Sequence, residues 1–506
     1  MKSIYLLALC LLAAPAFSQT APHEPEKPAA APAPAMTVEK PSVTHHKIVA
    51  HGKTLSYTAT AGRLPIRNEK GDIEAEMFYV AYTLDGAEGK RPLTFAFNGG
   101  PGSATVWLHM GAFGPKRVKM LPNGFMPPPP YQLEDNQDTW LDKSDLVFVD
   151  AIGTGYSRPA TPELGKKFWS VKGDVAAFGE FIRLYLQQNS RWTSPLYLAG
   201  ESYGTTRAAG LSGYLVDHGI ALNGIVLIST VMQFQTLEFD RGNDQPYALI
   251  LPTYAMIADY HKKLAAGVGD DPVALRHEVE QWVTNDYTVA LQKGDSLTAA
   301  ERDAVAEKLA RYTGLPKQYI LEKNLRIDLS AFDTELMRSD NKIIGRLDGR
   351  FTGTSLDQTS QEPDYDPSES AIRPPYTSLF GDYVKQELGY ETDLTYYILG
   401  GGVKGWDFND EQREGGYPDT SESLQKAFAK NPYMRVFVAE GNYDCATPYF
   451  AVDYTLDHMG LTPEEHSHIT RDHFEAGHMV YIDQSSLDRL KKDVDSFYDT
   501  TAHPTR

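Results

Sequence analysis

Residues 195–211 read PLYLAGESYGTTRAAGL, and this stretch decides how the whole chain is interpreted. It begins as an apolar run of strand length and continues with the spacing of a helix. Ser202 stands at the junction, and Gly200 and Gly204 lie on either side of its immediate neighbours. A sharp turn from strand to helix exposes the residue at its tip, and the glycines leave room for the strained backbone. The stretch therefore predicts a nucleophile elbow with Ser202 as the nucleophile.

The segments around this elbow alternate between strands and helices. The expected strands are almost continuously apolar, which is typical of strands buried on both faces of a parallel sheet. They lie within 92–100, 145–153, 224–230 and 434–441, and the first two of these segments end in glycine-rich turns. The expected helices between them lie at 175–188 and 205–219. This alternation predicts an α/β-hydrolase fold, with a mostly parallel central sheet and helices on both faces.

The first residues have the pattern of a targeting segment. Lys2 precedes an apolar run at 4–14, and a small-x-small cleavage pattern follows at 16–18. This predicts a signal peptide over residues 1–18, so we expect an exported protein, either periplasmic or secreted. Cys10 lies early in the segment and follows bulky Leu9, which argues against a lipoprotein anchor. No later segment has the apolar length of a membrane helix, so we expect no membrane anchor.

The remaining chain divides by composition. Residues 19–46 are rich in Pro and Ala and predict a semi-rigid tether. Residues 47–231 hold the first part of the α/β core, and 431–506 hold the second part. Between them, 232–430 contains helical pieces, many Asp, Gly and Pro residues and few buried-strand patterns. We interpret this range as a large, mainly helical cap insertion that divides one sheet.

Composition excludes several classes of function. The 506-residue chain has a formal net charge of -19, which disfavours binding to nucleic acid or to an anionic membrane surface. Cleavage of the signal peptide would remove Cys10 and leave Cys445 as the only cysteine, so no internal disulfide is expected. Cys445 is either a reactive thiol or a small buried residue. No residue cluster implies a metal or another cofactor, and the oligomeric state stays open.

A serine nucleophile needs a base and a carboxylate that orients the base. In an α/β-hydrolase these follow the serine in the order acid, then histidine, on loops after later strands. Asp444 follows the apolar run at 434–439, and His478 follows a further expected strand. Either residue alone could be an ordinary turn or loop residue. Together with Ser202, however, they match the order of a catalytic triad.

The oxyanion of an acyl-transfer intermediate needs two converging backbone N–H groups. One is expected from Tyr203, the residue after the nucleophile, and the other from a glycine-rich loop after an early strand. The sequence FAFNGGPGS at 95–103 is such a loop. Gly100 is the candidate donor in this loop, because the following residue, Pro101, has no N–H.

Five short motifs now resemble one known family. They are FNGGPGS at 97–103, GTGYS at 153–157, GESYG at 200–204, GNYDCATP at 441–448 and GHM at 477–479. In this order they are similar to the motifs of the serine carboxypeptidases of the carboxypeptidase C and cathepsin A type. LPTYA at 251–255 and GRLDGRFTG at 345–353 look like the bacterial branch of that family.

The resemblance implies removal of C-terminal residues from peptides with a free C-terminus, and it assigns residue roles. Ser202, Asp444 and His478 match the triad, while Gly100 and Tyr203 match the oxyanion donors. The residues that match the remaining roles are Asn98 and Glu201, which would hold the substrate carboxylate, and Met479, which would line the pocket of the departing residue. The segment RLDGRFTG at 346–353 has no assigned role.

The residues themselves support the role of Glu201. An ionised Glu201 beside the nucleophile would repel a substrate carboxylate, whereas a protonated Glu201, assisted by the Asn98 amide, could donate a hydrogen bond. Paired carboxyl groups that share one proton are known from other enzyme sites. We therefore expect activity to favour acidic conditions, while His478 has to be neutral to act as a base.

Two other classes of function use the same residues. A prolyl aminopeptidase-like enzyme or an esterase would keep the triad, although such aminopeptidases typically have HGGPG where this chain has NGGPG at 98–102. A non-catalytic binding module on the same scaffold is disfavoured by the complete set of serine, aspartate and histidine. Acyl transfer to an alcohol or amine stays chemically open, because it uses the same acyl-enzyme.

Overall fold

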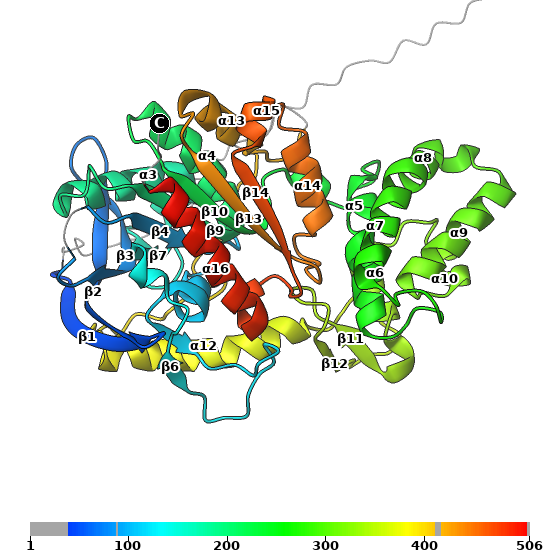
Figure 1. Ribbon diagram of the computed structural model, residues 1–506, viewed down its shortest axis with the longest axis horizontal. Helices are drawn as coiled ribbons and strands as arrows, with labels where there is room; N and C mark the ends of the chain where they lie inside the picture. Colours follow the sequence, from blue (N-terminus) through cyan, green and yellow to red (C-terminus); the bar gives the residue numbers. More distant parts are fainter. Residues whose placement is uncertain (1–38, 88–89, 410–415, 503–506) are drawn as a thin grey trace, which may run out of the picture. The chain divides into compact units, whose positions relative to one another are not determined.

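The computed structural model describes residues 39–87, 90–409 and 416–502. In this part of the chain one mixed sheet of ten strands has the order β1-β2-β3-β7-β4-β9-β10-β13-β14, with β8 paired to β3 (Figure 1). The strands are β1 Ser42–Ala50, β2 Lys53–Arg67, β3 Ile73–Leu84, β4 Leu93–Phe97, β7 Asp145–Val149, β8 Arg158–Pro159, β9 Leu196–Ser202, β10 Gly224–Thr230, β13 Arg435–Gly441 and β14 Ile469–Phe474. The predicted signal peptide at 1–18 lies outside the described residues.

The sheet is antiparallel at its N-terminal edge and parallel elsewhere. The pairs β1–β2, β2–β3 and β3–β7 are antiparallel. From β7 through β4, β9, β10 and β13 to β14 all neighbours run parallel. This confirms the predicted mostly parallel sheet. Because the carboxyl ends of parallel strands lie at one edge, the loops after β4, β9, β13 and β14 meet there.

Helices cover both faces of the sheet, and the alternation of side chains along each strand supplies both cores. In β9, Leu198 packs on one face while Tyr197 and Ala199 pack on the other. The face of Leu198 is covered by α3 Val171–Gln188, α4 Tyr203–Asp217 and α13 Ser421–Lys430. The opposite face is covered by α12 Pro367–Gln386 and α16 Gln484–Thr501.

The range 232–430, predicted as one cap insertion, contains two kinds of structure. Its first part forms a separate hydrophobic core that extends to Ile344. The helices of this part are α5 Gln245–Leu249, α6 Leu251–Tyr260, α7 Pro272–Trp282, α8 Thr288–Lys293, α9 Ala299–Thr313, α10 Lys317–Glu322 and α11 Leu329–Glu335, followed by a hairpin of β11 Lys342–Ile344 and β12 Thr352–Thr354. By contrast, α12 and α13 pack on the sheet, because their apolar side chains belong to its two cores.

The first strand begins at Ser42 and therefore includes the last residues of the range predicted as a tether. Its register pairs His45 with Thr58 and His46 with Tyr57. Edge pairing with β2 gives these residues the backbone hydrogen bonds that an isolated Pro/Ala-rich segment lacks. Among the described residues, every helix is too short or too polar to span a bilayer.

Candidate active site

The turn between β9 and α4 has the geometry of a nucleophile elbow. Ser202 has φ 60° and ψ −132°, a conformation that non-glycine residues rarely adopt and that marks stored strain. A Cβ at Gly200 would lie 2.3 Å from the carbonyl oxygen of Gly204, and a Cβ at Gly204 would lie 2.5 Å from that of Phe97. The two flanking glycines are therefore required by close backbone approach.

The loops after β13 and β14 bring Asp444 and His478 together. Nδ1 of His478 lies 2.7 Å from Oδ2 of Asp444, and both side chains are buried. The carboxylate is itself fixed, because Oδ1 accepts the N–H groups of Ala446 and Thr447 at 2.8 and 3.0 Å. The hydroxyl of Thr447 donates to Oδ2 at 2.7 Å. This arrangement can hold an imidazole in one orientation and stabilise its protonated form.

The environment raises the pKa of His478 above its ordinary value. Burial lowers this pKa, but the charge of Asp444 and the hydrogen bond to it raise it by more, and Glu201 adds to the increase. A group with this balance can accept a proton from a hydroxyl and release it later.

Asn98 and Glu201 form a second buried pair. Nδ2 of Asn98 donates to Oε1 of Glu201 at 2.9 Å, and Oδ1 of Asn98 accepts the N–H of Leu108 at 3.0 Å. The amide orientation is therefore determined by its partners. Burial raises the pKa of Glu201 to about 7, against the opposing influence of His478 and of the Tyr481 hydroxyl. Glu201 is thus poised to be protonated near neutral pH.

Two cavities adjoin Ser202. One, of about 150 Å³, has a lining that includes Asn98, Gly100, Glu201, Ser202, His478 and Met479. The other, of about 310 Å³, has a lining that includes Gly100, Ser202 and Tyr203 together with Phe239, Ile250 and Leu329 of the separate hydrophobic core. The structure thus places every predicted site residue at these cavities except Asp444. Asp444 contacts His478 but does not line either cavity.

The glycine-rich loop after β4 lies directly against the start of α4. A Cβ at Gly99 would be only 2.3 Å from the backbone nitrogen of Tyr203. Gly100 has φ 107°, which favours glycine. Tyr203 is the first residue of α4, where backbone N–H groups point away from the body of the helix. The loop and the helix start are therefore arranged so that N–H groups can converge beside Ser202.

Two supporting residues were missed in the sequence. Arg207 is fully buried and donates from Nη1 to the carbonyl oxygen of Asn98 at 2.7 Å, while its Nε lies 2.7 Å from Asp174. No sequence pattern indicated this contact. Thr447, which holds Asp444, could have been found, because a hydroxyl residue shortly after Asp is typical of a local side-chain turn.

Cys445 directly follows Asp444 in the chain, but its thiol is not activated. Its side chain is buried, and burial raises the pKa of the thiol well above its ordinary value. A thiol in this state is a poor nucleophile. Among the described residues, no group of His, Cys, Asp and Glu has an arrangement suited to a metal ion.

Comparisons with known proteins agree with this geometry. The model of a family described as serine carboxypeptidase matches residues 52–236. The pheromone-processing carboxypeptidase KEX1 of Saccharomyces cerevisiae is 30% identical over 171 residues, which are 31% of this chain and 22% of that protein. Serine carboxypeptidase-like 51 of Arabidopsis thaliana is 32% identical over 143 residues, 27% of each protein. The alignments therefore span about a quarter of the curated relatives.

A solved structure extends the likeness in fold to most of the chain. The crystal structure of a prohormone-processing carboxypeptidase from Saccharomyces cerevisiae superposes with a TM-score of 0.51 at 16% identity. The superposition covers 87% of this chain and 91% of that chain.

Proposed function

We propose that this chain, which belongs to the serine carboxypeptidase family through residues 52–236, removes the C-terminal residue from peptides through an acyl-enzyme on Ser202. One observation carries the proposal. The small cavity beside Ser202 is lined both by His478, which is paired with Asp444 at 2.7 Å, and by the Asn98–Glu201 pair, joined at 2.9 Å. Machinery for acyl transfer and a group able to hold a carboxylate thus share one space.

In the first half of the reaction, the Ser202 hydroxyl attacks the last peptide carbonyl while Nε2 of His478 takes the proton. Asp444 keeps the imidazole oriented and stabilises its positive charge. The N–H groups of Gly100 and Tyr203 receive the developing oxyanion. His478 then gives the proton to the departing amine, which leaves as the free C-terminal amino acid. Water, activated by the same histidine, hydrolyses the acyl-enzyme.

The carboxylate of the substrate would be held by Asn98 and a protonated Glu201. Oε1 of Glu201 already accepts from Asn98, which leaves Oε2 as the natural place for the proton. Within the described residues, Oε2 has no hydrogen bond of regular geometry. Met479 would line the pocket of the departing side chain, and the larger cavity under the cap would take the penultimate side chain. This clamp favours acidic pH.

The substrates would be peptides met outside the cytoplasm. The signal-peptide pattern at 1–18 supports export to the periplasm or to the exterior. The net charge of -19 disfavours nucleic acid as a ligand.

The test compares three forms of one peptide: N-acetylated with a free C-terminus, N-free with a C-terminal amide, and both termini free. Mass spectrometry follows which residue is released. The proposal requires release of single C-terminal residues from the acetylated peptide and strongly reduced turnover of the amide. Release from the N-terminus would favour an aminopeptidase. Absence of labelling of Ser202 by an organophosphonate in folded protein would favour a binding module.

A further inference from the structure

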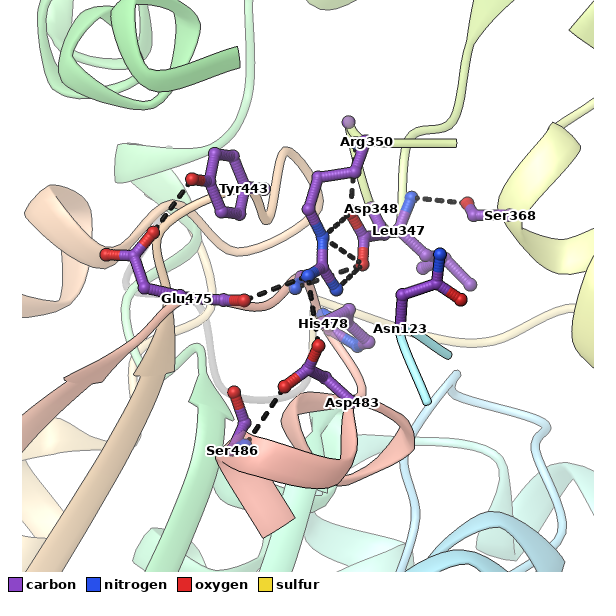
Figure 2. Close-up of polar contacts among 12 residues, drawn as sticks. Asn123, Leu347, Asp348, Arg350, Ser368, Tyr443, Glu475, His478, Asp483 and Ser486 are labelled. Carbon is purple, nitrogen blue, oxygen red and sulfur yellow. Dashed lines mark hydrogen bonds and ion pairs between the residues drawn. The ribbon is translucent and has the colours of Figure 1, made fainter. Parts of the chain in front are cut away.

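Residues 345–351 include most of the segment 346–353, which had no assigned role in the sequence, and they lie against the loop that carries His478 (Figure 2). We call residues 345–351 the brace. The backbone N–H of His478 donates to the carbonyl oxygen of Leu347 at 2.7 Å. The preceding N–H, of Gly477, donates to Oδ2 of Asp348 at 3.1 Å. The brace therefore accepts hydrogen bonds from two successive backbone N–H groups of the histidine loop.

The fit between the brace and this loop is close. A Cβ at position 477 would lie 2.4 Å from Cβ of Asp348 and 2.6 Å from the carbonyl oxygen of Leu347. Only glycine allows the loop to approach so near. On its other side, the carbonyl oxygen of His478 accepts the hydroxyl of Ser229, at the end of β10, at 2.5 Å. The backbone of His478 is thus held by the brace through its N–H and by the sheet through its carbonyl.

Arg350 connects the brace to both ends of the same loop. Its guanidinium forms a bidentate pair with Asp348, with Nε–Oδ1 at 3.0 Å and Nη2–Oδ2 at 2.7 Å. Nη1 donates to the carbonyl oxygen of Glu475 at 2.9 Å and lies 3.4 Å from Oδ2 of Asp483 (Figure 2). Asp483 in turn accepts the N–H of Ser486 as the N-cap of α16.

The brace also contacts the loop of the acid. The N–H of Gly349 donates to the carbonyl oxygen of Tyr443, the residue before Asp444, at 2.9 Å. The brace also contacts helix α12, because the N–H of Leu347 donates to the hydroxyl of Ser368 at 3.0 Å. One short segment thus bonds to the loops that carry two of the three proposed triad residues.

Arg350 and Asp348 form a deeply buried ion pair. The side chains of Arg350 and Asp348 are 7% and 3% exposed. Desolvation offsets most of the attraction in such a pair, so burial of this kind is weak evidence for stability. Its geometry, by contrast, is specific, because the planar guanidinium holds both oxygens of Asp348 and the carbonyl oxygen of Glu475 at once.

We propose that Asp348 and Arg350 are positioning residues. They hold the His478 loop so that the imidazole is oriented to accept the Ser202 proton. The orientation of the catalytic base thus depends on a segment inserted between β10 and β13. The inference rests on the proposed function only in so far as His478 is the base for Ser202. Neither residue lines the two cavities beside Ser202, so substrate affinity does not depend on them directly.

The test uses an organophosphonate of the fluorophosphonate class, which reacts with Ser202 without a peptide. The final amount of label counts folded, competent sites, while the rate of labelling reports how well His478 is positioned. Arg350→Lys keeps the charge but loses the planar fork. We expect full labelling at a rate reduced by about ten- to a hundredfold, the scale of a misplacement near 1 Å. With peptides, kcat per labelled site should fall while KM is maintained.

The matched control is Arg326→Lys, in the same insertion. Arg326 also forms a bidentate pair with an aspartate, Asp244 at 2.7 and 2.8 Å, and also donates to a carbonyl oxygen, that of Leu291 at 3.2 Å. It does not contact the His478 loop, so its labelling rate should equal that of the wild type. Asp348→Asn, which keeps an acceptor for the N–H of Gly477, should reduce the rate less than Arg350→Lys and serves as the second variant if Arg350→Lys does not fold.

Three results would overturn the proposal: wild-type labelling rates in both brace variants, an equal loss in Arg326→Lys, or a loss confined to the final amount of label. The last result would indicate a purely structural role. Wild-type protein that labels at Ser202 but releases no C-terminal residue would refute the carboxypeptidase proposal and leave the brace testable.

Discussion

Substitution of Glu201 by Gln tests the substrate clamp through its pH dependence. Glu201 accepts from Asn98 through Oε1, and its pKa is raised by burial to about 7. A Gln side chain can keep the same acceptor and place an NH₂ donor where the protonated Oε2 stands. The variant therefore keeps the hydrogen bond to the substrate carboxylate but removes the titration.

The expected size follows from the pKa. A carboxyl group with a pKa of about 7 is about 97% protonated at pH 5.5 and about 9% protonated at pH 8. Because only the protonated form can donate, the ratio of kcat/KM of the wild type to that of Glu201→Gln should fall about tenfold over this interval. The ratio isolates Glu201, since the titration of His478 affects both proteins. The fall toward acid pH belongs to His478, which has to be neutral and whose pKa is raised by Asp444. For Glu201→Gln, kcat/KM should still fall toward acid pH but should no longer fall toward alkaline pH.

The assay measures initial rates on an N-acetylated peptide at concentrations well below KM, from pH 5 to 9. The same peptide with a C-terminal amide is the control, since it lacks the group that the clamp recognises. Loss of a hydrogen bond to a charged group costs about 1.5–3 kcal/mol, so the amide should react about ten- to a hundredfold more slowly. An alkaline fall that persists unchanged in Glu201→Gln would refute the role of Glu201.

Four further outcomes follow from the site. Ser202→Ala should lower kcat about a million-fold without changing the thermal unfolding profile, and any larger residual activity would indicate another nucleophile. Asp444→Asn should lower kcat about 10⁴-fold, measured per folded protein, because the wrong tautomer of the histidine is favoured. Gly204→Ala places a Cβ 2.5 Å from the carbonyl oxygen of Phe97 and should destabilise the protein by about 1–3 kcal/mol in urea unfolding, whereas unchanged stability would contradict the close packing of the elbow. Cys445 should react with a thiol reagent only after denaturation, and rapid reaction in native protein would show that its burial is wrong.

Sequence patterns were most informative where the cause of a structure is local. The glycines around Ser202 are required by backbone contacts within a few residues or in the adjacent strand. Apolar runs such as that of β9 reflect burial on both faces of the sheet. For these reasons the α/β fold, the elbow and the expected chain order of Ser202, Asp444 and His478 could be proposed from the sequence.

The range 232–430 shows where such patterns fail. Helices of the cap and helices of the sheet have the same amphipathic spacing, because each buries one apolar face. Spacing therefore could not show that Leu424 and Phe428 of α13 pack on the sheet, while Leu309 of α9 belongs to the separate core. The partner of an apolar face is a property of the tertiary structure.

By itself, then, the sequence determined the class of fold, the strained turn at Ser202 and a set of candidate groups for acyl transfer, because strand burial and backbone sterics leave local patterns. Only the tertiary structure decided what holds these groups in place. The contact between Asp348 and the N–H of Gly477 joins residues 129 positions apart, and the contact between Asn98 and Glu201 joins residues 103 apart. Such hydrogen bonds have no periodicity along the chain, since they depend on how distant loops meet at the edge of the sheet.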